Sequence, residues 1–397
     1  MPRRGLHIAT FEDVVAGRVT DAYFVRTMEI LRAKGLDKEV RAEVIAKNLP
    51  GEESWAVLAG IEEASELLTT LDVAVRAMPE GTIFRPYQPV LELAGSYQAF
   101  AIYETPLLGL LCQASGVATK AARCRKLAGA KTLISFGARR MHPAISPMVE
   151  RAAFLGGCDG TSVIISAELL GEQARGTMPH ALIIVFAGEI GDPERATVVA
   201  TEAFDEVVDP AIPRISLIDT FNDEKFEAMA VAAALGRHLS GVRLDTPASR
   251  RGNFHRILEE VRWELDLRGY QHVKLFVSGG IDEDEIRALN DIADAYGVGT
   301  SISDAPTIDF ALDIVAVDGQ PLAKRGKQSG AKGVWRCPRC FADAVTPLDA
   351  PPPPCPCGGR REELLRPLVA DRKLLAALPT PQDIRRYVLD QLEHVTI

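Results

Sequence analysis

The sequence has neither a long apolar run nor an excess of positive charge. No stretch approaches the about 20 apolar residues that a membrane-spanning helix needs, and the basic start Met-Pro-Arg-Arg is not followed by an apolar segment of signal length. We therefore expect a cytoplasmic protein without a membrane partner. The net charge of −9 argues against nucleic acid as the main ligand, because that affinity needs a basic stripe to displace counterions from phosphates.

Cysteines are also few, and they fall into two groups. Three of them are scattered among apolar or small residues and are expected to be buried thiols, namely Cys112, Cys124 and Cys158. The other four lie close together on Pro- and Gly-containing turns, namely Cys337, Cys340, Cys355 and Cys357. This second group predicts a tetrahedral zinc site, which is structural because four thiolates leave no open position for chemistry. The alternatives, free thiols or two disulfides, are disfavoured in the cytoplasm.

With 397 residues, of which 47% are hydrophobic, the chain can bury two or three cores. Residues 1–112 predict an α+β domain with one solvated sheet face. Its expected helices are Asp21–Lys34 and Ile61–Leu71, and its expected strands are Val40–Lys47, Trp55–Leu58, Val73–Met78 and Val90–Leu93. Residues 306–397 form a predicted carboxyl-terminal domain that has strand texture at Phe310–Val317, contains the four-cysteine site and ends in an amphipathic helix from Pro381.

Residues 113–305 carry short apolar strands followed by helices at a regular pace. The expected strands are Thr132–Phe136, one ending near Asp159, one ending near His180, Arg214–Asp219, Gly241–Asp245, Val273–Ser278 and Ala295–Val298. About seven such steps predict an α/β fold with a TIM-like, incomplete or complete, parallel barrel. The apolar runs after Asp159 and His180 could be strands, but cap-type residues before them favour helices. That choice places both residues at carboxyl ends of strands, where barrel enzymes build active sites.

Two glycine-containing loops follow the last two predicted barrel strands. One loop contains Ser278, Gly279 and Gly280, and the other contains Gly299 and Thr300. Backbone N–H groups can approach an anion closely at such turns. Ordinary turn chemistry explains many single glycines, but two neighbouring loops favour one phosphate site.

Three residues at other strand ends each have a simpler explanation beside the functional one. Asp245 can hold the vicinal hydroxyls of a ribose, or it can pair with an arginine of Ser249–Gly252. Phe136 can stack on an aromatic ligand, or it can be an ordinary core residue. Arg139 can bind an anion, or it can be a solvated arginine at a helix start.

His180 alone would more often be a satisfied or exposed histidine than a catalytic one. Its neighbours Gly176 and Thr177 allow an oxyanion to approach, and a helix that begins after it stabilises negative charge. These are conditions in which an imidazole can be phosphorylated. A nucleophilic His180 is therefore a hypothesis.

Taken in order, these residues resemble the nicotinate phosphoribosyltransferases, which are type II phosphoribosyltransferases. The resemblance covers nearly the whole chain and is greatest to the shorter archaeal-type members, which also carry a cysteine-rich carboxyl-terminal zinc segment. The matching segments are Thr20–Phe24, Phe136–Pro143, Gly157–Ser162, Gly176–His180, Val242–Asp245, Ser278–Gly280, Gly297–Thr300 and Lys324–Lys327.

The resemblance implies the condensation of nicotinate with 5-phosphoribosyl-1-pyrophosphate, which gives nicotinate mononucleotide and pyrophosphate in NAD salvage. It further implies ATP as a co-substrate, Mg²⁺ held mainly by the substrate, and a homo-oligomer with a shared active site. Among the substrate-binding residues, Phe136 and Tyr23 would sandwich the pyridine ring, with Tyr23 reaching across a subunit interface. Arg139 and Arg243 would hold anionic groups, and Thr177 also belongs to this set.

The resemblance implies catalytic roles for three residues. His180 would be phosphorylated by ATP, Asp245 would hold the ribose hydroxyls and Asp159 would face the bound substrate. The glycine loops would take the 5-phosphate. Pro179 stands where many relatives have a small residue.

Two related activities and one unrelated function are alternatives. A quinolinate phosphoribosyltransferase shares the barrel but needs no ATP and binds a second carboxylate, and a nicotinamide enzyme recognises a neutral ring substituent. The segment Gly176–His180 and the extra carboxyl-terminal domain favour nicotinate over quinolinate. A zinc-ribbon binding protein with an inactive barrel is a remote alternative, which the acidic charge disfavours.

Overall fold

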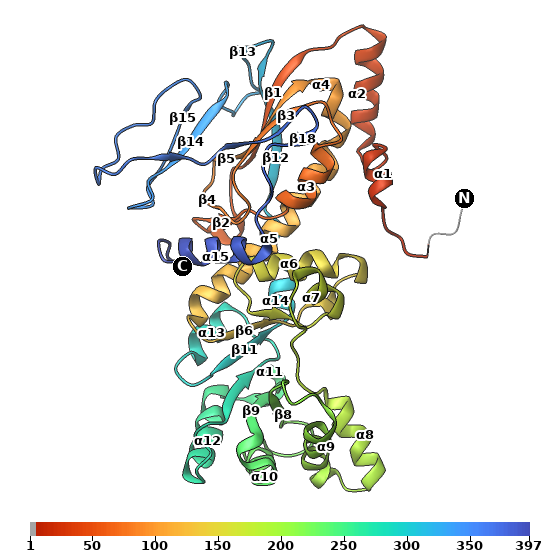
Figure 1. Ribbon diagram of the computed structural model, residues 1–397, viewed down its shortest axis with the longest axis vertical. Coiled ribbons are helices and arrows are strands. Elements are labelled where there is room, and N and C mark those ends of the chain that lie inside the picture. The colour runs from red at the N-terminus through yellow and green to blue at the C-terminus, as the bar shows by residue number, and fades with distance from the viewer. Residues whose placement is uncertain (1–4) are drawn as a thin grey trace. The chain divides into compact units, whose positions relative to one another are not determined.

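The chain forms two compact units in a computed structural model that describes residues 5–397 (Figure 1). One unit is Arg123–Asp304, and the other joins the chain up to Ala122 with Ala305–Ile397. This joining occurs because β12 (Phe310–Val317) pairs antiparallel with β1 (Glu39–Ala46). The predicted division into three domains, with boundaries near residues 112 and 305, stays a prediction.

A seven-stranded antiparallel sheet forms the centre of the first unit. Its order is β13-β12-β1-β5-β3-β17-β18, and the further bounds are Gln320–Pro321 (β13), Pro89–Ser96 (β5), Ala74–Ala77 (β3), Arg366–Ala370 (β17) and Lys373–Leu374 (β18). Its helices include α1 (Phe11–Val15), α2 (Ala22–Ala33), α3 (Ile61–Leu68), α4 (Tyr97–Phe100), the first part of α5 (Glu104–Ala128) and α15 (Pro381–Leu392). The helices and strands predicted for residues 1–112 are therefore confirmed.

The core of this unit lies between the sheet and α3. Val44, Leu91 and Leu67 are fully buried there. Gly60 precedes α3 with a φ of +93°, and a Cβ at this position would lie 2.2 Å from the backbone oxygen of Leu110. Only glycine fits both the left-handed backbone and the close approach.

The cysteine segment belongs to a small antiparallel sheet in the same unit. This sheet has the order β15-β14-β16, with bounds Asp343–Pro347, Lys332–Arg336 and Glu362–Glu363. A separate pair consists of β2 (Ala56–Val57) and β4 (Ile83–Phe84). The final helix predicted from Pro381 is confirmed as α15, and Thr380 accepts a hydrogen bond from the backbone of Asp383 as its N-cap.

A six-stranded, wholly parallel sheet forms the second unit. Its order is β7-β6-β11-β10-β9-β8, with bounds Gly160–Thr161, Thr132–Ser135, Ala295–Val298, Lys274–Val277, Leu239–Leu244 and Arg214–Leu217. The helices that accompany it are α6 (Ser146–Leu155), α7 (Ile164–Leu170), α8 (His180–Ile190), α9 (Pro193–Val207), α10 (Glu224–Leu235), α11 (Ala248–Arg251), α12 (Phe254–Leu267), α13 (Glu283–Leu289) and α14 (Thr300–Ser303). The edge strands β7 and β8 do not pair with each other, so the sheet is an open half-barrel. This confirms the predicted α/β class.

Two predicted strand positions in this unit are wrong. No strand of the described chain ends near His180, because the nine residues before it form a loop with glycines and Pro179, and His180 itself begins α8. Asp159 does not end a strand but immediately precedes β7. The two ambiguous apolar runs are helices, α7 and α8, as predicted.

The stability of the first unit is expected to depend on a buried ion pair between Lys332 and Glu43. Lys332 Nζ lies 2.8 Å from Glu43 Oε2, with side chains only 6% and 3% exposed. Burial raises the pKa of Glu43, and Lys332 opposes that shift. Lys332→Met should therefore lower the free energy of unfolding by about 3–5 kcal/mol in urea titrations, because it leaves an unpaired buried carboxylate.

The matched control is Lys38→Met. Lys38 pairs with Asp318 on the surface, where both side chains are about half exposed. Exposed pairs contribute little, so this variant should unfold at the same urea concentration as the unmodified protein. Equal stability of both variants would contradict the prediction.

Candidate active site

The carboxyl ends of the parallel strands gather the residues that the sequence singled out. Phe136 follows β6, Asp245 follows β9 and Ser278 follows β10. In a parallel sheet these ends share one edge. His180, at the start of α8, reaches the same edge through contacts with Asp245.

His180 lies between two carboxylates and a hydroxyl. Its Nδ1 is 3.0 Å from Thr220 Oγ1, and its Nε2 is 3.7 Å from Asp245 Oδ2 and 3.9 Å from Asp219 Oδ1. The Asp245 carboxylate, more than Asp219, raises the pKa of His180, while burial opposes the shift. The imidazole is 40% exposed, so a ligand can reach a ring that its neighbours orient.

Asp219 is a further candidate site residue, which the sequence pattern did not single out. Its side chain is 3% exposed, and its Oδ2 accepts hydrogen bonds from Asp245 N (2.7 Å) and Thr246 Oγ1 (2.9 Å). Its Oδ1 has no hydrogen-bond partner among the described residues and faces His180. Burial raises the pKa of Asp219. The signal was present, since Asp219 ended a predicted strand whose carboxyl end joins this edge.

Asp245 contacts site residues instead of forming only an ion pair with nearby arginines. Its Oδ1 accepts a hydrogen bond of 3.0 Å from Ser278 Oγ. Burial acts to raise the pKa of Asp245, but His180 and the charge of Arg243 hold it below its usual value. A Cβ at Gly279 would lie 2.8 Å from both an Asp245 carboxylate oxygen and the Asp245 carbonyl oxygen. Glycine is therefore required for Ser278 and Asp245 to meet.

Phe136 is only partly buried and lines a cavity of about 480 Å³ on the half-barrel, which extends to the amino-terminal ends of β6 and β10 at Thr132 and Lys274. Its ring centroid is 5.8 Å from that of Phe276, and the Arg243 guanidinium lies 5.9 Å from its centroid. A Cβ at Gly297 would be 2.4 Å from the ring, so glycine leaves the space that the ring occupies. Thr177 also lines this cavity. Phe136 also packs against the buried cluster of Ile134, Phe276 and Ala295, so it is a core residue with one side on the cavity.

The two arginines assigned to anion binding have different environments. Arg243 donates one hydrogen bond, from Nη2 to the Met178 carbonyl (3.1 Å), and its buried Nε has no hydrogen-bond partner among the described residues. Burial lowers the pKa of Arg243. Arg139 is exposed on the short 3₁₀ turn Ala138–Arg140. Arg243 thus offers a desolvated donor, and Arg139 offers a solvated charge.

The glycine loops lie side by side because β10 and β11 pair in parallel. Gly279 and Gly280 have φ values of +81° and +74°, a left-handed backbone that favours glycine and leaves room for a ligand to approach the chain closely. The second loop passes through Gly299 into α14, which begins at Thr300.

Asp159 is not part of this cluster in the described structure. Asp159 forms an ion pair with Arg125 and accepts a hydrogen bond from the backbone of Leu133 near the start of β6. Its predicted position at a strand's carboxyl end is wrong, because the register pairs β7 with β6 only after Asp159. Tyr23 lies on α2 in the other unit and is 57% exposed.

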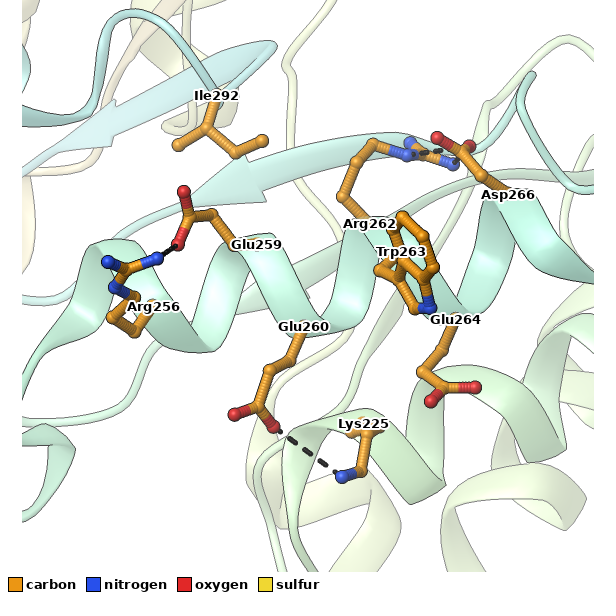
Figure 2. A pocket seen from close by; sticks show the side chains of 9 residues that line it. All are labelled: Lys225, Arg256, Glu259, Glu260, Arg262, Trp263, Glu264, Asp266 and Ile292. Atoms are coloured by element: carbon orange, nitrogen blue, oxygen red, sulfur yellow. Dashed lines mark hydrogen bonds and ion pairs between the residues drawn. The ribbon is translucent and has the colours of Figure 1, made fainter.

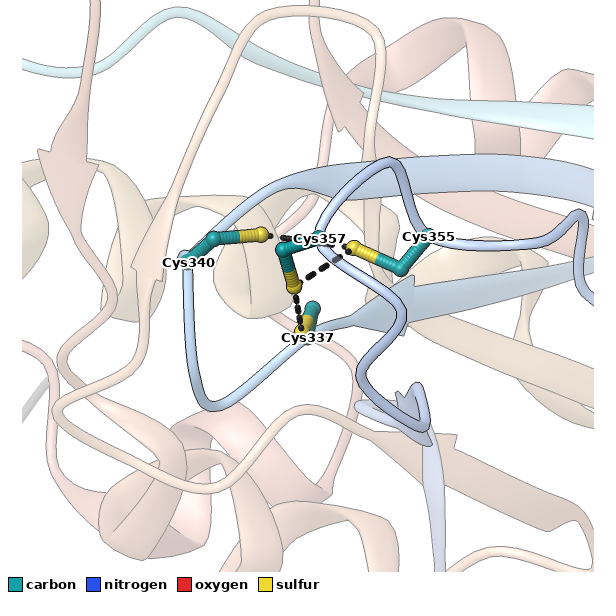
Figure 3. A group of neighbouring side chains, drawn as sticks. All are labelled: Cys337, Cys340, Cys355 and Cys357. Carbon is teal, nitrogen blue, oxygen red and sulfur yellow. Dashed lines mark hydrogen bonds between the residues drawn. The ribbon is translucent and has the colours of Figure 1, made fainter.

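The four predicted cysteine ligands come together (Figure 3). All four Sγ atoms lie within 4.8 Å of one another, and three of their separations are 3.3, 3.5 and 3.6 Å. These distances exclude disulfides, whose sulfur atoms are about 2.05 Å apart, and approach the about 3.8 Å between thiolates on one tetrahedral zinc ion. The cluster can hold a metal ion.

A second hollow, of about 700 Å³, runs along α12 and is lined mainly by charged side chains (Figure 2). These charges pair with one another, as in Arg256 with Glu259 and Lys225 with Glu260. We assign no chemistry to this hollow. In residues 5–397, no helix combines the length and apolarity needed to cross a membrane.

The contact between His180 and Asp245 predicts a specific titration. A raised pKa means that the protonated imidazole stabilises the fold fully below about pH 6.5, the unfolded value, and that this contribution is lost as the pH rises through the folded pKa. Asp245→Asn should move the titration midpoint of His180 to lower pH. Histidine Cε1 NMR shifts would measure it, and Asp291→Asn, which contacts His255 instead, should leave it unchanged. An unaltered midpoint in Asp245→Asn would contradict this.

Comparisons with known proteins agree with the geometry. The amino-terminal and carboxyl-terminal domain models of quinolinate phosphoribosyl transferase match residues 21–115 and 117–313. A nicotinate phosphoribosyltransferase of Mycobacterium tuberculosis is 31% identical, covering 80% of this chain and 76% of that protein. The crystal structure of a nicotinate-nucleotide pyrophosphorylase from Pyrococcus furiosus covers 100% of both chains at 51% identity with a TM-score of 0.95. Human nicotinic acid phosphoribosyltransferase shares the fold, with a TM-score of 0.74, 21% identity and coverage of 95% and 94%. The chain therefore belongs to the nicotinate phosphoribosyltransferase family of type II phosphoribosyltransferases.

Proposed function

We propose that this protein is an ATP-coupled nicotinate phosphoribosyltransferase of NAD salvage. It joins nicotinate to 5-phosphoribosyl-1-pyrophosphate and releases nicotinate mononucleotide and pyrophosphate. The observation that carries the proposal is one strand edge with a ring site at Phe136, a carboxylate at Asp245, two glycine loops and an oriented His180. The name of the Mycobacterium relative supports it.

The ring site suits an aromatic anion. In our proposal the pyridine ring stacks on Phe136 in the cavity that Thr177 also lines. The ring carboxylate accepts a hydrogen bond from Nε of Arg243, and Arg139 adds a second positive charge. Tyr23, exposed on α2, covers the ring from a second copy of the chain, which makes the active unit a homo-oligomer.

The sugar and its phosphate take the remaining positions on the edge. Asp245 accepts hydrogen bonds from the ribose hydroxyls, and Ser278 holds Asp245 in place. The N–H groups of Gly279, Gly280 and the Gly299–Thr300 loop hold the 5-phosphate. Asp159, engaged with Arg125, serves in this scheme to fix the start of β6 and not to contact substrate.

The transfer needs positioning and electrostatics more than a strong base. The ring nitrogen donates its lone pair to the anomeric carbon while the bond from that carbon to the pyrophosphate oxygen breaks with its electron pair, so no proton moves. Positive charge builds on the sugar, and the Asp245 and Asp219 carboxylates lie at the same edge to stabilise it. When bound, mainly by the substrate, Mg²⁺ would neutralise charge on the pyrophosphate group.

ATP coupling is assigned to His180. A neutral imidazole nitrogen attacks the γ-phosphorus of ATP, the bond to the β-phosphate oxygen breaks and ADP leaves. The charge that forms on the ring is stabilised by Asp219 and Asp245, and Thr220 fixes the ring's orientation.

Quinolinate phosphoribosyl transfer is the second candidate, because the matching domain models carry that name. The Pyrococcus structure carries the name nicotinate-nucleotide pyrophosphorylase. Read literally, this name denotes the reaction of pyrophosphate with nicotinate nucleotide, which is the reverse of the transfer proposed above. A second ring carboxylate would need a further cation, and Lys274 and Arg175 line the same cavity. Nicotinamide would offer Arg243 a neutral amide in place of a carboxylate.

A substrate panel tests the function. Pyrophosphate release from phosphoribosyl pyrophosphate should be fastest with nicotinate and should rise at least about tenfold with ATP. His180→Ala should abolish the stimulation by ATP but keep the slow ATP-independent transfer, because the ring and sugar sites remain. The exposed His238 gives the control, and His238→Ala should retain full stimulation. Faster reaction with quinolinate in the absence of ATP would reject the proposal.

The metal site is proposed to hold one structural zinc ion. Zinc bound by four thiolates stabilises a small sheet that has little core of its own. Elemental analysis should find about one zinc per chain, lost together with thermal stability in Cys340→Ser but kept in Cys112→Ser, a cysteine outside the cluster. A protein purified without chelator that contains no zinc would refute this assignment.

A further inference from the structure

Glu150 is a buried acidic residue without a role in the scheme above. It lies on α6 and is 0% exposed. The hydroxyls of Thr161 and Ser135 and the backbone N–H of Ala138 face its carboxyl group. Neither carboxyl oxygen, however, is in full hydrogen-bonding geometry with a described residue. A buried polar group of this kind needs an explanation.

The groups that face Glu150 belong to the turn that carries the ring-binding residue. Ser135 ends β6 and directly precedes Phe136, and it pairs in register with Thr161 of β7. Ala138 begins the 3₁₀ turn Ala138–Arg140, whose first N–H groups have no partner within the turn itself. Glu150 therefore faces this segment at Ser135, just before it, and at Ala138, in its middle.

The other side of the same segment is closely packed. A Cβ on Gly137 would lie 2.4 Å from the Ser303 side chain and 2.8 Å from the carbonyl oxygen of Gly299. Phe136 itself donates its backbone N–H to the carbonyl of Val298. The turn thus rests against α14 and β11, and Glu150 is the polar group that faces it from α6.

Burial raises the pKa of Glu150, and the facing hydroxyls and N–H oppose that shift. An uncharged carboxyl group has one donor and two acceptor oxygens. It can therefore donate to one hydroxyl and accept from the Ala138 N–H at the same time. A glutamine has the same shape and the same two capabilities.

We propose that Glu150 is a positioning residue that holds the Phe136–Arg140 turn against α6 and so sets where the pyridine ring and the Arg139 charge are placed. Its link to nicotinate rests on the proposed function. The link to the turn does not, since it follows from the packing of α6, β6 and β7 alone.

Backbone hydrogen exchange tests the turn without any assumption about activity. In Glu150→Ala, the peptide that contains residues 136–141 should exchange about tenfold faster, and in Glu150→Gln it should stay within about twofold of the unmodified protein. Asp205→Asn is the control. It weakens an ion pair with Arg214 at the start of β8 and should leave this peptide unchanged. Equal exchange in Glu150→Ala and the unmodified protein would overturn the proposal.

Steady-state kinetics test the consequence for the substrate. The KM for nicotinate should rise at least about tenfold in Glu150→Ala while kcat changes less than about threefold, and Glu150→Gln should restore the KM. Glu150→Asp, which withdraws the acid by one methylene, should behave like Glu150→Ala and replaces it if that variant does not fold. An inactive unmodified protein would reject the proposed function, and hydrogen exchange would still decide the role of Glu150. An unchanged KM beside faster exchange would overturn the link to ring placement.

Discussion

The site depends on how β8 and β9 are paired. Their parallel register places Leu217 opposite Arg243, so the residues that follow, Asp219 and Asp245, meet at one edge. Two carboxylates that both contact the imidazole of His180 repel each other. The backbone N–H of Asp245 and the imidazole of His180 relieve that repulsion. The loop before α8 places His180 beside these two carboxylates, whose negative charge stabilises a protonated imidazole.

Much of this arrangement was predictable from local sequence. Strand ends such as Asp245 and Ser278, and the glycine loops after them, follow from short apolar runs and turn chemistry. The four-cysteine cluster followed from ligand spacing alone. Such features depend on neighbours within a few residues, so the sequence pattern carries them.

The failures concern contacts between distant residues. The contacts of Asp219 and Glu150 depend on which strand and helix lie beside them, which periodicity does not reveal. Asp159 was placed at the wrong end of its strand because β7 is only two residues long and begins after it. For His180, the helix was correctly predicted but its preceding strand was not, since a loop can bring a residue to the same edge.

The pairing of β12 with β1 constrains the order in which the chain can fold. The sheet of the first unit cannot be completed until residues beyond Val317 have left the ribosome, whereas every strand of the half-barrel lies between Thr132 and Val298. During synthesis, the three strands β1, β5 and β3 must wait with both edges unpaired while the inserted half-barrel forms, because β1 pairs with β12 and β3 with β17. Glu39–Ala46 thus has an edge that stays open to pairing with other nascent chains until β12 is made, and the later strand β17 completes the sheet by pairing with β3.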